Sequence, residues 1–307
     1  MGKKLVFRGA ACALVTPMKR GQIDYPRLDG IIEAQIDGGT EALIIGGTTG
    51  EAATLSDTER FELYSYVKEK INRRIKLIFG TGTNDTNLAV KHSKTARDIG
   101  CDGMLVVTPY YNKGTYRGVV EHYKKIAAVS DIPLILYNVP SRTGVNLTLK
   151  QLAELAKTEN IVGIKEASDS ADRLTELSSF GDELDLYAGN DSQIFITLAL
   201  GGAGVISVVS NLYPKKIADI CKLYDSGKIE ESRKLQLELL EFIKLLFKET
   251  NPAPIKYAMS LKGLCKSDVR LPLCIPEKST RIAIKSEIER LDMLFSGAQL
   301  KGYSQMP

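Results

Sequence analysis

Lys165 is the residue in this sequence that first suggests chemistry. It follows Ile161, Val162 and Ile164, whose branched apolar side chains are typical of a buried strand. Because burying a charge without a partner costs free energy, an ammonium at the edge of such a run needs a reason. Loss of hydration favours the neutral amine, and a neutral amine beside a bound ketone or aldehyde forms a Schiff base. The alternative is an ammonium that extends from the strand end to solvent.

Hydroxyl groups and one further cation follow other apolar runs. The motif "GGTTGE" places Thr48 and Thr49 in a glycine-rich turn, whose N–H groups and hydroxyls suit a carboxylate. Tyr137 ends an apolar run and has a hydroxyl that can move protons, although a buried tyrosine with a satisfied hydroxyl is an equal alternative. Arg142 in "PSRTG" can bind a second carboxylate, with a surface arginine as the alternative. Together these groups suit an enzyme that forms an imine with a 2-oxo acid.

The sequence gives little support for catalysis by histidine, for a metal site or for nucleotide binding. His92 and His122 fall within predicted helices, away from the groups above. This disfavours a histidine general base or a zinc site, which needs His or Cys at ligand spacing. The sequence has no Walker A motif, and no GxGxxG follows the first predicted strand. We therefore expect no cofactor and no metal.

Eight short apolar runs give the sequence its organisation. Each is almost continuously hydrophobic, as strands covered on both faces are. The runs are residues 9–17, 41–47, 75–82, 102–111, 132–140, 160–168, 184–191 and 203–211. Amphipathic stretches between them predict helices at 58–71, 86–100, 147–160 and 192–202. Expected caps are Ser56 or Asp57, Thr148 and Asp191 at N-termini, and Gly100 and Gly201 at C-termini.

The alternation of strands and helices predicts an α/β fold, a (β/α)₈ TIM barrel with a C-terminal helical extension. Eight units in about 210 residues match the count and size of such a barrel, and a doubly wound sheet is the alternative. Residues 1–213 would form the barrel with its catalytic site. Residues 214–307 would form the eighth barrel helix and the extension of the same domain, with helices at 214–249, 252–263 and 280–295. Barrel active sites lie at the C-terminal ends of the strands, where the candidate residues stand.

The composition is that of a soluble globular protein. Of the 307 residues, 44% are hydrophobic and 25% are charged, and the net charge of +4 is spread over interleaved lysines and acids. A nucleic-acid-binding protein would need a clustered basic face. No run is long enough for a membrane span, and Arg8 and Pro17 interrupt the apolar start that a signal peptide needs. Five cysteines without a CxxC pair favour a reducing compartment. We expect a cytoplasmic protein with no nucleic-acid or membrane partner.

Several motifs in a fixed order carry a family resemblance. They are "GGTTGE", "TPYYN", "YNVPSRTG", "GIKEAS", "GND", "GGAGVISV" and "NPAPIK". With them the chain resembles the dihydrodipicolinate synthase family over essentially its whole length. The resemblance implies a class I aldolase-type lyase on a (β/α)₈ barrel, assembled as a homotetramer (a dimer of dimers). Such an enzyme condenses pyruvate with L-aspartate 4-semialdehyde, a step in diaminopimelate and lysine biosynthesis.

The resemblance also implies roles for the catalytic groups. Lys165 would form the imine with pyruvate, and Tyr137 would be the general acid and base beside it. Thr48 would help to hold the pyruvate carboxylate and would join a proton relay. Tyr111 would complete this relay from the neighbouring subunit.

Substrate-binding roles follow in the same way. Thr49 would hold the pyruvate carboxylate, Arg142 would bind the semialdehyde carboxylate, and Gly189 and Ile206 match positions that line the site through main-chain groups. N-acetylneuraminate lyase and 2-keto-3-deoxy sugar acid aldolases share the lysine and the tyrosine. Arg142 and the double threonine favour the synthase over these alternatives. The intact catalytic set argues against a third alternative, a non-catalytic barrel that binds a keto acid.

Some members of this family are inhibited by lysine, and here the sequence departs from the inhibited pattern. Asn84 and Tyr110 match it. However, Asp57 and Arg60 stand where inhibited enzymes carry histidines, and Leu88 stands where they carry a glutamate. Leucine cannot pair with an ammonium, so we expect weak or absent inhibition by lysine.

Overall fold

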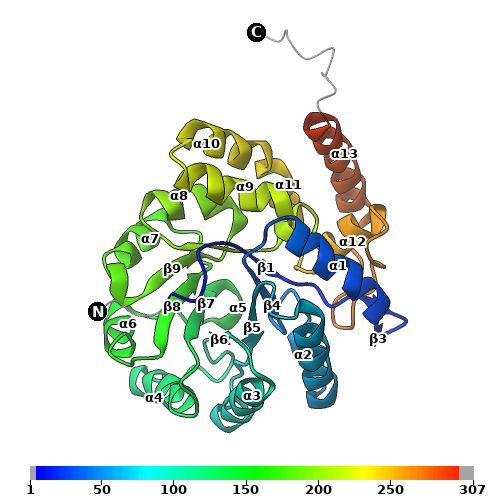
Figure 1. Cartoon of the computed structure of the whole chain (residues 1–307). Helices are drawn as coiled ribbons and strands as arrows, with labels where there is room; N and C mark the ends of the chain where they lie inside the picture. The colour runs from blue at the N-terminus through cyan, green and yellow to red at the C-terminus, as the bar shows by residue number, and fades with distance from the viewer. Residues whose placement is uncertain (1–4, 297–307) are drawn as a thin grey trace.

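Eight parallel strands close into a barrel in a computed structural model, which describes residues 5–296. The strands are β1 (Gly9–Ala13), β4 (Ala42–Ile45), β5 (Lys76–Gly80), β6 (Gly103–Val107), β7 (Leu134–Asn138), β8 (Ile161–Glu166), β9 (Asp185–Ala188) and β10 (Gly204–Ser207). Each pairs with its neighbours in chain order, and β1 pairs with both β4 and β10, which closes the ring. The predicted TIM barrel is confirmed, and the doubly wound alternative is wrong. Figure 1 shows the strands at the centre of a ring of helices.

Helices follow the strands, and all of them except the short α5 (Pro140–Thr143), which lies at the mouth, cover the outside of the barrel. They are α1 (Tyr25–Asp37), α2 (Asp57–Ile71), α3 (Thr86–Ile99), α4 (Tyr116–Ala127), α5 (Pro140–Thr143), α6 (Leu149–Leu155), α7 (Ala171–Ser178), α8 (Ile194–Ala199) and α9 (Pro214–Asp225). Ser56, one of the two candidates, and Thr148 cap α2 and α6 as predicted, and each also forms a capping box. Gly100 ends α3 with φ of 93°, a conformation that favours glycine. Gly201, with φ of 83°, follows the end of α8.

Asp191 does not cap α8, contrary to the prediction. It lies in a short 3-10 segment (Asp191–Gln193), and its buried carboxylate accepts hydrogen bonds from the Ser207 hydroxyl and from the N–H groups of Val208 and Val209. The side chain therefore ties the loop after β9 to the end of β10. This long-range role has no signature in the local sequence.

The C-terminal extension contains more helices than expected. After α9, the chain forms α10 (Ile229–Glu238), α11 (Leu240–Leu246), α12 (Ala253–Leu261) and α13 (Lys278–Phe295). The single helix predicted over 214–249 is wrong, because the chain turns at Gly227 with φ of 79° and again at Leu239. The other two predicted helices are confirmed, and α13 packs against α11 and α12. Residues 297–307 of the predicted extension lie outside the described part. A hairpin of β2 (Met18–Lys19) and β3 (Gln22–Ile23) was too short to predict.

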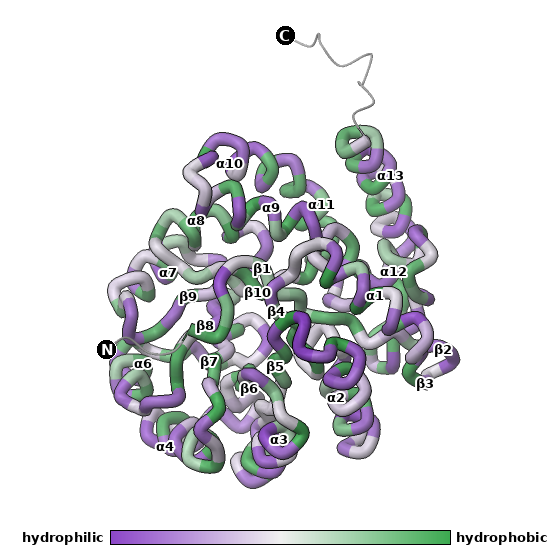
Figure 2. The backbone as a smooth tube through the Cα atoms, in the orientation of Figure 1, coloured by the Kyte–Doolittle hydropathy of each residue, from purple (hydrophilic) through white to green (hydrophobic). Residues whose placement is uncertain are grey.

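Two layers of apolar side chains hold the barrel together. Inside it, alternating strand residues pack with Phe7, whose ring stacks on Tyr187 with centroids 4.5 Å apart. The Tyr187 hydroxyl donates to the Phe7 carbonyl at 2.8 Å, so large side chains fill the N-terminal end of the barrel. In Figure 2, hydrophobic residues are concentrated in the strands, whereas hydrophobic and hydrophilic residues are mixed along the outer helices.

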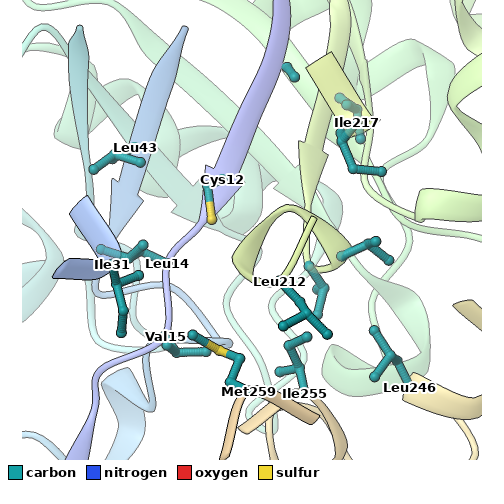
Figure 3. Close-up of a cluster of buried hydrophobic side chains, with 14 of the residues drawn as sticks. Cys12, Leu14, Val15, Ile31, Leu43, Leu212, Ile217, Leu246, Ile255 and Met259 are labelled. Atoms are coloured by element: carbon teal, nitrogen blue, oxygen red, sulfur yellow. The ribbon is translucent and has the colours of Figure 1, made fainter. Parts of the chain in front are cut away.

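The extension shares the outer hydrophobic core with the barrel. Figure 3 shows Val15, from the loop after β1, beside Met259 of the extension, with Ile255 next to Met259. Cys12 of β1 and Leu246 of the extension belong to the same cluster. Burial of such side chains provides much of the free energy of folding, so barrel and extension stabilise each other. Among residues 5–296, no helix is long and apolar enough to cross a membrane. All five cysteines are free thiols.

Candidate active site

A one-residue irregularity in strand pairing places Lys165 beside Tyr137. Between β7 and β8 the register shifts, so that Leu134 lies opposite Ile161 whereas Ile135 lies opposite Gly163. From there Tyr137 is paired with Lys165. Residues paired across neighbouring strands project to the same face, and Tyr137 belongs to the barrel interior. The Lys165 Nζ lies 4.4 Å from the centroid of the Tyr137 ring.

Gly163 makes this arrangement possible. A Cβ atom at this position would lie 2.9 Å from the Asp185 carbonyl oxygen and 3.2 Å from the Tyr187 ring. A larger residue would therefore push β8 away from β9. The glycine lets the strand pass close to Tyr187 and keeps Lys165 in line with its neighbours.

Lys165 is buried without a carboxylate in contact. The residue is 5% exposed, and no residue of the described chain forms an ion pair or a hydrogen bond with Nζ. The carboxylate nearest in sequence, Glu166, is occupied: it accepts from Asn138 Nδ2 at 2.9 Å and from the Ser168 N–H at 2.9 Å. Asp191 acts only from a distance, and burial raises the pKa of its carboxyl group although the Lys165 charge opposes this. The lysine amine is thus available to a ligand.

The glycine-rich turn after β4 has a fixed backbone. Gly46 has φ of 69°, and a Cβ atom there would lie 2.3 Å from the Tyr64 hydroxyl. Glu51 also has a left-handed backbone, with φ of 56°. Its carboxylate is held by the Lys256 ammonium at 2.5 Å and by the Arg270 N–H at 2.8 Å. These contacts fix the turn that carries the two threonines.

A cavity of about 810 Å³ at the C-terminal ends of the strands brings most candidate residues together. Those that line it are Thr48, Thr49, Tyr137, Arg142, Lys165 and Gly189. A side chain at Gly189 would collide with the Glu166 carbonyl, because its Cβ would lie 2.6 Å from that oxygen. Arg142 is exposed at the rim and donates to the Asn251 carbonyl oxygen at 3.1 Å.

Two candidate residues are placed differently. Ile206, expected to line the site through main-chain groups, is fully buried in the barrel interior and paired with Ala11, and it is not among the residues that line the cavity. Tyr111 is 89% exposed, has φ of 71°, and lines neither this cavity nor its neighbour. Within its own chain, Tyr111 is therefore outside the site.

A second cavity, of about 460 Å³, adjoins the first and shares Thr48, Tyr137, Arg142 and Asn251 with it. His92 lines this second cavity but not the cavity that contains Lys165. Its Nε2 lies 2.8 Å from the Asp57 carboxylate, and burial lowers the pKa of the imidazole.

His122, the other histidine, is in contact with Thr86, Nδ1 to Oγ1, at 2.9 Å, and burial lowers its pKa to about 4. Over residues 5–296, no group of three or more His, Cys, Asp or Glu side chains is arranged to hold a metal ion.

Three polar residues that form or support the site were not predicted. Glu51 and Lys256 form a fully buried ion pair, and Asn251 lines both cavities. The motifs "GGTTGE" and "NPAPIK" contain all three, but they are about 200 positions apart, and nothing in either motif indicates the contact between them.

Comparisons with known proteins agree with this geometry. The model of the dihydrodipicolinate synthetase family matches residues 6–291. The 4-hydroxy-tetrahydrodipicolinate synthase of Clostridium novyi is 49% identical over 285 residues, which are 92% of this chain and 96% of that protein. The crystal structure of dihydrodipicolinate synthase from Thermotoga maritima superposes with a TM-score of 0.92 at 39% identity, covering 94% of this chain and all of that one. The corresponding synthase of Methylacidiphilum fumariolicum gives a TM-score of 0.93 at 37% identity over 95% of this chain and 98% of its own.

Proposed function

Because the chain belongs to the dihydrodipicolinate synthetase family, its activity is that of a 4-hydroxy-tetrahydrodipicolinate synthase, and we propose that it acts on pyruvate and L-aspartate 4-semialdehyde through an imine on Lys165. The observation that carries the imine is the placement of Lys165, buried at the end of β8 without a contacting carboxylate and 4.4 Å from the Tyr137 ring. A lysine that is desolvated and unpaired is a good nucleophile toward a carbonyl.

The first half-reaction uses the barrel mouth alone. The Lys165 amine attacks C2 of pyruvate, and loss of water from the resulting carbinolamine gives the imine. The turn after β4 holds the pyruvate carboxylate through its N–H groups and the hydroxyls of Thr48 and Thr49. Tyr137 accepts and returns the protons, and removal of a methyl proton gives the enamine.

The second half-reaction needs the acceptor. Arg142, exposed at the rim of the cavity, binds the carboxylate of the semialdehyde. The enamine carbon attacks the aldehyde and forms the new carbon–carbon bond. The amino group of the semialdehyde then attacks C2 and displaces the lysine amine, which closes the ring and frees Lys165. One water leaves in the whole reaction, during imine formation.

Tyr111 belongs to this proposal as a residue supplied by a neighbouring subunit. Its side chain is 89% exposed on a left-handed backbone with φ of 71°, a conformation that costs free energy, and no residue among 5–296 forms a hydrogen bond or a ring contact with its side chain. A homotetramer built as a dimer of dimers would place it in a partner's relay with Thr48 and Tyr137. The five free thiols are consistent with a reducing cytoplasm as its location.

Borohydride trapping tests the imine directly. With pyruvate present, the peptide that contains Lys165 should gain the mass of a reduced pyruvate adduct, and the Lys165→Met variant should gain none. Turnover is then measured with L-aspartate 4-semialdehyde, a downstream reductase and NADPH. An adduct without turnover would indicate that the second substrate is a sugar acid precursor and not the semialdehyde. Absence of an adduct would overturn the proposal of an imine on Lys165.

A further inference from the structure

Asn251 connects the C-terminal extension to both substrate-binding elements of the mouth. It lies between α11 and α12, is 4% exposed, and lines both cavities. Its side-chain Nδ2 donates to the Thr49 hydroxyl oxygen at 3.0 Å. Its main-chain oxygen accepts from Arg142 Nη2 at 3.1 Å. One residue thus contacts the side chain assigned to the pyruvate carboxylate and the one assigned to the semialdehyde carboxylate.

The direction of the bond to Thr49 determines what Thr49 can offer to a ligand. A hydroxyl group has one proton and accepts through its lone pairs. Because Asn251 Nδ2 has no lone pair to receive a proton, the Thr49 oxygen must be the acceptor in this contact. The Thr49 proton is then left to point elsewhere. A carboxylate in the cavity, which only accepts, is the partner that such a proton suits.

The side-chain oxygen of Asn251 indicates that the N–H donor on Nδ2 is needed. Asn251 Oδ1 is buried and has no hydrogen-bond partner among residues 5–296. A buried acceptor without a donor lowers stability, so a residue that only filled this space would be better without the amide. The cost is understandable if the N–H group toward Thr49 serves the site.

The extension holds Asn251 in place independently of any ligand. Lys256, on α12, forms a buried ion pair with Glu51, which belongs to the same turn as Thr49. The Arg270 N–H donates to the second oxygen of Glu51 at 2.8 Å. The turn is therefore fastened to the extension at Thr49 and at Glu51, and the Asn251 amide has little freedom to rotate away.

From these contacts we infer that Asn251 is a positioning residue for pyruvate: its amide fixes the Thr49 hydroxyl as a hydrogen-bond donor to the substrate carboxylate. The inference rests on the proposed function, because it takes pyruvate as the ligand of Thr49. It predicts that changes of the Asn251 side chain act through the Thr49 hydroxyl and mainly on pyruvate.

The test is a double-mutant cycle on the full-length enzyme, with KM measured for both substrates. Asn251→Ala should raise the KM for pyruvate about tenfold and change the KM for the semialdehyde less than about threefold. Asn251→Asp keeps the shape but turns the donor into an acceptor, which captures the Thr49 proton, so its KM for pyruvate should rise further. Thr49→Val should match Asn251→Ala, and the double variant should be no worse than Thr49→Val alone.

Controls separate this role from folding and from the proposed function. Asn160→Ala removes asparagine hydrogen bonds at the opposite end of the barrel, from Nδ2 to the carbonyls of Ala127 and Ser130, and should leave the KM for pyruvate unchanged. Trapping of pyruvate on Lys165 in the wild type checks the imine first. With trapping intact, effects of Asn251→Ala and Thr49→Val that multiply in the double variant would overturn the inference. So would an Asp variant that binds pyruvate better than the Ala variant.

Discussion

Lys165 at the end of β8 and Lys256 in α12 are both removed from solvent, with exposures of 5% and 0%. Lys256 has a carboxylate in contact, since its Nζ lies 2.5 Å from Glu51. Lys165 faces an aromatic ring at 4.4 Å, and its own neighbour Glu166 is bound by other donors. Burial is common to both lysines, and the partner distinguishes them.

The difference separates a structural cation from a chemical one. Burial lowers the pKa of Lys256 while the Glu51 charge opposes the shift, and the ion pair leaves no atom free to react. Removing one member of such a pair strands a charge in the interior. Lys165 forms no ion pair or hydrogen bond through Nζ with any residue among 5–296, so its removal leaves no directly contacting carboxylate without its partner. Substitutions of the two lysines should therefore have opposite profiles.

Lys165→Met should have the largest effect on activity and a small effect on stability. We expect kcat to fall at least about a thousandfold, because the covalent route is lost, while the free energy of unfolding changes by less than about 1 kcal/mol. Steady-state kinetics and urea unfolding of the same preparation measure both. A Lys165→Met variant that keeps a tenth of wild-type activity would contradict the assignment of Lys165 as the chemical lysine.

Lys256→Met should reverse this profile. Leaving Glu51 buried and unpaired should cost about 3–5 kcal/mol of unfolding free energy. The matched double variant Glu51→Gln/Lys256→Met removes both charges and should recover most of that loss. Urea unfolding of the two single variants and the double variant gives the comparison. A stable Lys256→Met protein would show that the pair contributes little.

Arg142→Ala tests whether Arg142 binds the second substrate. Loss of a charged hydrogen-bond donor should raise the KM for L-aspartate 4-semialdehyde about 10- to 100-fold, and the KM for pyruvate less than about threefold. Arg97→Ala, at an exposed site on α3, provides the control. Equal losses for the two substrates would contradict the role assigned to Arg142.

Acid should weaken the partly exposed contact between α2 and the extension. A hydrogen bond from Arg270, Nη1 to Oε2 at 2.9 Å, holds the pKa of Glu59 at about 2, below its ordinary value of 4.5. A carboxyl group with a depressed folded-state pKa stabilises the fold above its unfolded pKa. This stabilisation is lost as pH falls from about 4.5 to 2. After allowance for screening by solvent, it should amount to about 1 kcal/mol. Unfolding of wild type and Glu59→Gln across pH 6 to 2.5 should show a shallower slope for the variant; identical slopes would refute the assignment.

Free lysine added as an inhibitor should have the smallest effect of all on activity. The Asp57 carboxylate is already paired with Lys91 at 2.6 Å and with His92, and these hydrogen bonds lower its pKa. Leu88 adds no charge to the second cavity, which Asp57 and Leu88 both line. Initial rates with millimolar lysine should stay near the uninhibited value. An inhibition constant in the micromolar range would contradict this expectation.

Much of the mouth could be predicted because a parallel barrel converts sequence order into position. Every strand ends at the same rim, so Thr48, Tyr137 and Lys165 could be placed together from the apolar runs that precede them. The N-caps at Ser56 and Thr148 were also local and could be recognised. The catalytic roles of these residues remain predictions, supported by the motifs and by the geometry.

The barrel, its strand order and the side chains at its rim can be inferred from the amino-acid sequence alone, since these follow from local periodicity. The folded structure was needed to establish the register shift between β7 and β8, because a shift of one residue changes the face of every side chain without altering the hydrophobic pattern. It was also needed to establish the contacts of Asn251 with Thr49 and of Lys256 with Glu51, which join segments about 200 residues apart. Such contacts depend on how the extension packs against the barrel, and no local pattern encodes that packing.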